Sequence, residues 1–172
     1  VRAEGGAVLR EGLVRFLATQ FIEKQSGRSA AEAERLRERL AYSAVVLREA
    51  PLSKVTALEP TYFSTVPNKG AMVWRLADHL IGREVFMATL KELLAAAKSS
   101  PDGLSLTMLR AALAERGGAT VKKVLDQQLD QTTDMDLLAG LPHQENGQWV
   151  SALRNLGSVE AVVTVAGYSS TG

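Results

Sequence analysis

Residues 66–82 of the chain read VPNKGAMVWRLADHLIG, and this stretch predicts an amphipathic helix. Apolar side chains recur in it every three to four residues, as in a helix that buries one face, and they are Met72, Val73, Leu76, Leu80 and Ile81. Asn68 is a residue type that caps a helix N-terminus, and Gly82 is one that ends a helix. We therefore expect a helix over 68–81, preceded by a loop over 51–67.

The same periodicity predicts further helices on both sides of this one, giving about six in all. Stop signals separate them, because Gly27, Pro51 and the turn-forming residues 99–103 each interrupt the apolar pattern. Residues 29–32 have the spacing of a capping box and begin the second helix. We expect the other helices over about residues 7–24 and 29–49, around Phe86–Leu94 up to Ser99, around Leu106–Leu113 up to Gly117-Gly118, and around Val121–Leu129.

The composition changes near residue 136. The chain holds 20 Lys and Arg and 19 Asp and Glu residues, and of these only Glu145, Arg154 and Glu160 lie beyond that point. Short extended runs there predict strands over 148–156 and 159–166, joined by a turn at 155–158. Two or three strands cannot close a sandwich. We therefore expect them to be the first strands of a β-sandwich that continues beyond residue 172.

The predicted organisation is a mainly α chain in two parts. Residues 1–134 form a helical bundle, and residues 135–172 form the truncated start of a β-sandwich-like domain. The chain begins at Val1 without an initiator Met and closes just after a strand-like run. We expect it to be a segment of a longer protein.

Composition excludes several classes of function. With 46% hydrophobic and 23% charged residues the chain is globular, and no apolar run is long enough for a membrane span. A formal net charge of +1 gives no basic surplus for nucleic acid. There is no Cys, and the two His residues, His79 and His143, do not have the spacing of a metal-binding pair. No Gly-rich phosphate loop is present.

Glu11 is the first candidate site residue. It lies in the stretch Leu9-Arg10-Glu11-Gly12 within an apolar helix, and burying its carboxylate without a partner would be costly. A metal or another cation would satisfy it. The alternative is an ion pair with Arg15 or Arg10 on a solvated helix face, which the spacing by itself favours.

Tyr62 is the second candidate. It precedes a predicted helix N-terminus, where a phenol on a loop is able to donate a hydrogen bond to a developing oxyanion. The alternative is that Tyr62 and Phe63 form an aromatic pair that packs the loop onto the core. We assign no ligand role to His79, which follows Asp78 on a helix face and is expected on the surface.

Two of these motifs together resemble the gluzincin zinc aminopeptidases, the family of the alanyl aminopeptidases. Residues 9–12, followed by Phe16 and Leu17, are similar to the Asn-Glu-Gly motif of the family's second zinc helix, with Arg10 in place of Asn. Residues 66–76, with Lys69-Gly70-Ala71, resemble the Tyr-x-Lys-Gly-Ala helix that follows. The order of elements is similar over about residues 4–170.

The resemblance implies the C-terminal half of a thermolysin-like peptidase domain, with Glu11 as a third zinc ligand and Tyr62 as a catalytic residue that stabilises the transition state. The parent protein would hydrolyse peptide substrates through a zinc-bound water. The H-E-x-x-H helix that supplies the other ligands would lie before Val1. We therefore expect zinc in the full-length parent, and no zinc bound by this fragment and no activity from it alone.

One departure from the family leaves alternatives open. Pro67 stands where the family has its transition-state tyrosine, although some members carry a second tyrosine at the position of Tyr62. A catalytically degenerate, peptidase-like binding or scaffold module is one alternative, and an unrelated helical interaction domain is another. The first helix, residues 7–24, would be left with an exposed apolar face, which suggests a homodimer formed through it.

Overall fold

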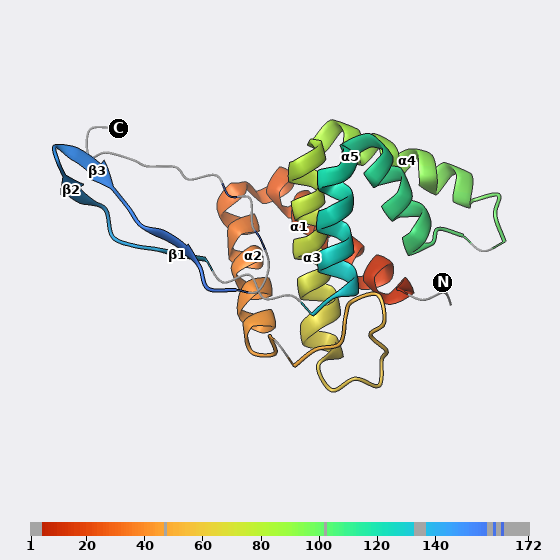
Figure 1. The fold of residues 1–172 in the computed structure, drawn as a ribbon. Helices are drawn as coiled ribbons and strands as arrows, with labels where there is room; N and C mark the ends of the chain where they lie inside the picture. The colour runs from red at the N-terminus through yellow and green to blue at the C-terminus, as the bar shows by residue number, and fades with distance from the viewer. Residues whose placement is uncertain are drawn as a thin grey trace. The chain divides into compact units, whose positions relative to one another are not determined.

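The computed structural model describes residues 5–46, 48–101, 103–132, 137–157, 160 and 163, and the fold is mainly α (Figure 1). The chain divides into two compact units, Val1–Thr132 and Thr133–Gly172. The described helices of the first unit are the π-helical turn η1 (Val8–Leu13), α1 (Val14–Ser26), α2 (Arg28–Ser43), α3 (Tyr62–Ile81), α4 (Arg83–Ala97) and α5 (Leu106–Asp130). The described strands of the second unit are β1 (Leu137–Ala139), β2 (His143–Glu145), β3 (Gln148–Val150) and β4 (Leu153–Asn155).

Helix α3 is the centre of the bundle. It packs against η1, α1, α2, α4 and α5, and in Figure 1 it runs through the middle of the helical unit. Of the predicted apolar stripe, Val73 is buried and the other four side chains are half-buried, whereas Trp74, which the predicted stripe did not include, is fully buried. The indole Nε1 of Trp74 donates a hydrogen bond of 3.3 Å to the carbonyl of Val8 in η1. The core therefore forms around α3, with η1 bound directly to it.

Two glycines allow η1 and α3 to cross at very close range. A Cβ atom added to Gly12 would lie 2.8 Å from the Cα of Gly70, and one added to Gly70 would lie 2.9 Å from the Cα of Gly12. Such distances are too short for a side chain, so only glycine at both positions permits the crossing. The Glu-Gly and Lys-Gly-Ala motifs therefore meet through their glycines.

The predicted start of α3 at Asn68 is wrong, because the helix begins six residues earlier at Tyr62 and contains Pro67. Proline lacks the N–H that would reach the carbonyl of Phe63. The side-chain amide of Asn68 donates instead to that carbonyl at 3.3 Å and to the carbonyl of Ser64 at 2.9 Å. The predicted role of Asn68 as an N-terminal cap is therefore wrong, because its side chain satisfies carbonyl groups inside the helix.

The expectation of about six helices is corrected to five α-helices in the described residues, preceded by η1. The predicted fifth and sixth helices are the two arms of α5, which kinks at Gly118, where φ is 72° and ψ is −165°. The break predicted at Gly117-Gly118 is therefore a kink. Helix α2 ends at Ser43, before the end that the sequence predicts at residue 49.

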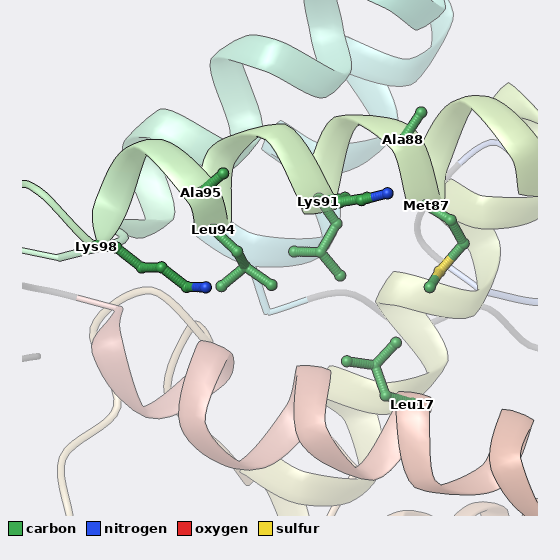
Figure 2. A pocket seen from close by; sticks show the side chains of 8 residues that line it. Leu17, Met87, Ala88, Lys91, Leu94, Ala95 and Lys98 are labelled. Carbon is green, nitrogen blue, oxygen red and sulfur yellow. The ribbon is translucent and has the colours of Figure 1, made fainter.

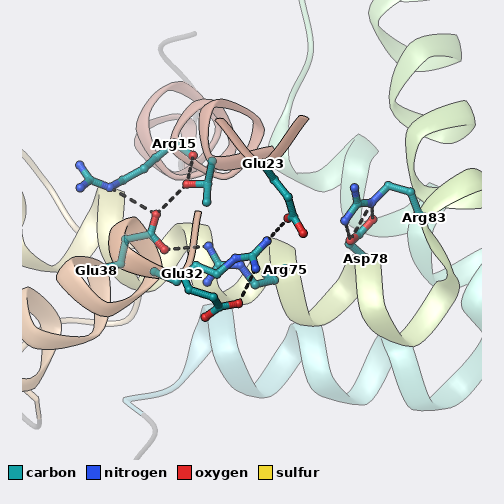
Figure 3. Close-up of polar contacts among 9 residues, drawn as sticks. Arg15, Glu23, Glu32, Glu38, Arg75, Asp78 and Arg83 are labelled. Carbon is teal, nitrogen blue, oxygen red and sulfur yellow. Dashed lines mark hydrogen bonds and ion pairs between the residues drawn. The ribbon is translucent and has the colours of Figure 1, made fainter. Parts of the chain in front are cut away.

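A buried carboxylate joins three helices of the bundle (Figure 3). Glu38 of α2 has a fully buried side chain, and it accepts hydrogen bonds from Thr19 of α1 at 3.1 Å and from Arg75 of α3 at 2.7 Å. The Nε of Arg15 lies 3.5 Å from the same carboxylate. Near the end of α3, the buried carboxylate of Asp78 pairs at 2.7 Å with Arg83, the first residue of α4. Ion pairs therefore hold the polar side of the bundle together.

The described strands form two antiparallel pairs, β1 with β4 and β2 with β3. The turn between β2 and β3 is Asn146-Gly147, with φ values of 52° and 78°, as a two-residue hairpin turn requires. The expected strand over 148–156 is wrong, because it is divided into β3 and β4. Its expected partner over 159–166 lies largely outside the described residues, of which only 160 and 163 belong to that run.

None of the described helices combines the length and the hydrophobicity that a bilayer crossing requires. The expectation that this segment carries no membrane span agrees with that observation.

Candidate functional site

The two candidate residues from the sequence lie together in the fold. Glu11 is half-buried in η1, and its Oε1 accepts a hydrogen bond from the hydroxyl of Tyr62, which is 51 residues further along the chain. Tyr62 lies in the first turn of α3, not on the expected loop. Because Gly12 and Gly70 hold η1 against α3, the carboxylate and the phenol are presented to each other by two helices in direct contact.

The ion pair of Glu11 with Arg15 or Arg10, which was the alternative prediction, does not form. Within the described part of the chain, neither Arg10 nor Arg15 is paired with Glu11, and Arg15 lies beside Glu38. The hydrogen-bond partner that the described residues give Glu11 is therefore the phenol of Tyr62. The segment is also π-helical, a geometry that occurs frequently at functional sites.

Tyr62 is held as a hydrogen-bond donor. Its side chain is buried, and its ring meets that of Phe63 edge-on at 5.2 Å between centroids. Phe63 is 78% exposed, so the two rings pair but do not pack a loop onto the core as the alternative predicted. Burial raises the pKa of the phenol, and so do the hydrogen bond to Glu11 and the charge of Glu11, while Arg10 opposes the shift. The proton therefore stays on the phenol at neutral pH.

Among the described residues, Glu11 is the one side chain that we assign to a candidate metal site. No group of three or more His, Cys, Asp or Glu side chains comes together anywhere in the described ranges. His79 is exposed near the end of α3, and His143 belongs to β2 in the other unit. Glu11 fits the requirements of a single oxygen ligand, because one of its oxygens is oriented by Tyr62 while the side chain is still partly open to solvent. A three-ligand zinc site is not assembled from these residues.

A second polar cluster lies further along α3 and was not found from the sequence. Lys69, 3% exposed, lies 3.1 Å from the buried carboxylate of Glu49, which also accepts a hydrogen bond of 2.6 Å from Tyr42. The ammonium group is 5.3 Å from the centre of the Tyr42 ring. Burial lowers the pKa of Lys69 against the opposing effect of Glu49. The lysine of the Lys-Gly-Ala motif thus fastens α3 to the segment after α2.

The Lys69–Glu49 pair predicts a contribution to stability that acid removes. Burial of the Glu49 carboxyl opposes ionisation, but the hydrogen bonds from Tyr42 and Lys69 outweigh it, so the pKa lies below the ordinary value of 4.5. A carboxylate shifted in this direction stabilises the fold above its unfolded-state pKa and loses that effect as the pH falls through the folded-state pKa. We expect Glu49→Gln to be less stable than the wild type at neutral pH, and the difference to shrink below about pH 4.5. Urea unfolding at a series of pH values measures this, and a difference that does not change with pH would contradict it.

The fold and the site together define a mainly helical protein in which a phenol orients a single half-buried carboxylate. Comparison of the chain with protein-family models, with curated proteins and with solved structures finds no match in any of the three.

Proposed function

We propose that this chain is the helical part of a zinc-dependent, aminopeptidase-like metallopeptidase, in which Glu11 is one zinc ligand. The observation that carries the proposal is the hydrogen bond from Tyr62 to Glu11. Glu11 belongs to one of the motifs that resemble that family, Tyr62 occupies the position of a second tyrosine that some members carry, and the two residues come from segments far apart in the sequence. The two histidine ligands would come from polypeptide outside residues 1–172, and the substrate would be a peptide.

The arrangement around Glu11 suits a metal ligand. Carboxylates that bind metals are themselves commonly hydrogen-bonded, which fixes their orientation before the metal binds. Tyr62 gives Glu11 such a partner, and the close crossing at Gly12 and Gly70 sets the position of both. Bound zinc would supply an activated water for hydrolysis.

Tyr62 is the residue of this chain that we propose stabilises the transition state. A hydrogen-bond donor aimed at a developing oxyanion must keep its proton at the working pH. The raised pKa of this phenol meets that requirement. The hydroxyl has a single proton, which it donates to Glu11 in this structure, so it would orient the free ligand and turn to the oxyanion once the carboxylate binds zinc.

A second candidate function is a peptidase-like binding or scaffold module that has lost catalysis. Pro67, at the position of the family's transition-state tyrosine, supports it. Proline has no hydrogen-bond donor in its side chain. Pro67 lies within α3, where the side-chain amide of Asn68 donates to the carbonyl of Phe63, which proline leaves without a backbone N–H. The helix therefore accommodates Pro67 in its structure, while a donor for catalysis is missing at that position.

The test uses the full-length polypeptide that carries this segment, with Glu11→Gln, Tyr62→Phe and, as a matched control, Glu115→Gln on the exposed face of α5. Bound zinc per chain and hydrolysis of an aminoacyl anilide are measured. We expect Glu11→Gln to lose zinc, Tyr62→Phe to keep zinc but react about 10²-fold more slowly, and the control to match the wild type. Zinc and hydrolysis unchanged in Glu11→Gln would reject the peptidase proposal. A wild-type protein that binds peptides without hydrolysing them would favour the binding module.

A separate expectation concerns residues 1–172 alone. One carboxylate is a weak zinc site, so metal analysis of this chain after dialysis against zinc is expected to find no stoichiometric zinc. Tight zinc binding by this chain would mean that its ligands have been identified wrongly.

A further inference from the structure

An apolar groove lies between α1 and α4, away from Glu11 and Tyr62. Its volume is about 660 Å³, and apolar side chains from the two helices line it, among them Leu17, Met87, Leu90 and Leu94. Figure 2 shows Leu17 of α1 facing the α4 side chains across this space. Met87 and Leu94 are 40% and 46% exposed, so the lining is open to solvent.

The apolar surface continues along α1. Val14 and Phe21 lie about one helical turn on either side of Leu17 and share its face of the helix. They are 58% and 63% exposed. A row of exposed apolar side chains at this spacing matches the way in which a groove receives a partner helix through anchors at i, i+3, i+4 and i+7.

The charged side chains that line the groove are both lysines. Lys91 lies on α4 and Lys98 directly follows its last residue; both side chains are exposed, and no acidic residue is part of the lining. Neither lysine forms an ion pair with a carboxylate in the described residues, whereas Glu92, on the same helix, pairs with Arg116. The groove is therefore apolar at its base and positively charged at its edge.

We propose that this groove binds an amphipathic helix of a partner protein whose apolar face is flanked by acidic residues. The apolar lining would take the anchor side chains, and Lys91 and Lys98 would pair with the acidic flank. A second copy of this chain suits the groove less well. In a two-fold interface each groove faces its own equivalent, which would bring the lysines of both copies into one interface. The proposal is independent of the zinc chemistry above.

The probes are two labelled synthetic helical peptides of about 18 residues, long enough to form a helix on the groove. They carry the same leucine stripe, flanked by glutamates in one and by lysines in the other. Binding to the 172-residue chain is measured by fluorescence anisotropy. We expect the acidic peptide to bind at least about tenfold more tightly than the basic one, and to weaken as salt is added.

Two sets of variants locate the binding. Lys91→Glu combined with Lys98→Glu is expected to reverse the preference between the peptides, and Leu94→Glu to abolish binding of both. Lys54→Glu and Leu58→Glu are the matched controls, because these residues are exposed and lie outside the groove. The five altered side chains, three on the groove and two in the controls, are exposed, so folding should be preserved, which thermal unfolding checks.

Three results would overturn the proposal. The first is equal binding of the two peptides, or binding of neither. The second is acidic-peptide binding that persists in Leu94→Glu and in the double lysine variant. The third is a dimer in light scattering that Leu94→Glu dissociates, since a second copy of the chain would then be the occupant of the groove.

Discussion

Replacement of Glu38 by alanine is expected to lower the free energy of unfolding by about 3–5 kcal/mol, because breaking a buried ion pair leaves charged and polar partners without compensation. The Glu38 side chain is fully buried, and it is the common acceptor for Thr19 of α1 and Arg75 of α3. The hydroxyl of Thr19, which also donates to the carbonyl of Arg15 at 3.0 Å, keeps that partner, so the loss falls mainly on Arg75. Urea unfolding followed by circular dichroism measures the change.

Glu34→Ala is the matched control for this prediction. Glu34 lies on the same helix and pairs with Arg37, but that pair is on the surface, with side chains 29% and 67% exposed. Surface pairs contribute about 0–1 kcal/mol, so this variant should remain close to the wild type. Glu38→Gln should fall between the two, because an amide keeps the shape and one acceptor oxygen. Equal stabilities of Glu38→Ala and Glu34→Ala would show that the buried cluster does not stabilise the bundle.

Gly12→Ala is expected to destabilise the protein by about 1–3 kcal/mol, as overpacking of a filled interface does. The added Cβ would meet the Cα of Gly70 at 2.8 Å and the carbonyl oxygen of Val66 at 3.2 Å, both of them backbone atoms that cannot rotate away. Helix propensity acts in the opposite direction, since alanine is favoured over glycine by about 1 kcal/mol. A net loss of stability would therefore isolate the steric effect of the crossing. Gly12→Val should cost more.

The crossing also predicts coupling between the two glycines. Gly70→Ala should destabilise in the same way, and the double variant by less than the sum, because the first substitution already separates η1 from α3. Ala18→Val, at an exposed position of α1, is the control for added volume and should change stability by less than about 0.5 kcal/mol. Additive effects, or a Gly12→Ala variant more stable than the wild type, would mean that the helices do not cross as closely as described. Separation of η1 from α3 should also break the hydrogen bond between Tyr62 and Glu11.

The existence of the helices could be predicted from local pattern, and their boundaries could not. The stripe that includes Val73 and Leu76 is sufficient for α3, because a helix with one apolar face must bury it. Pro67, by contrast, signals a helix start when only neighbouring residues are considered. The structure places it inside α3, since Asn68 supplies the hydrogen bond that proline cannot. In the strands, the dipeptide Asn146-Gly147 is typical of a two-residue hairpin turn, and it forms the turn between β2 and β3.

The residues of the candidate site could also be predicted from the sequence, but the contact between them could not. The sequence pointed separately to Glu11 and Tyr62, each beside a short motif, but nothing local indicates that the hydroxyl of one donates to the carboxylate of the other. The cluster of Lys69 and Glu49 was missed because a lysine in an amphipathic helix is ordinarily solvated. Here it faces a carboxylate from the segment after α2 and is buried.

Alone, therefore, the sequence determined the helical class, the presence of an amphipathic helix at α3 and the two residues proposed for the site. These depend on periodicity and residue chemistry within a few turns of chain. The tertiary structure decided which glycines touch, where α3 begins, which carboxylates are buried and that Glu11 meets Tyr62. Each of these depends on segments far apart in the chain being brought into contact, and such contacts form only when the helices pack around α3.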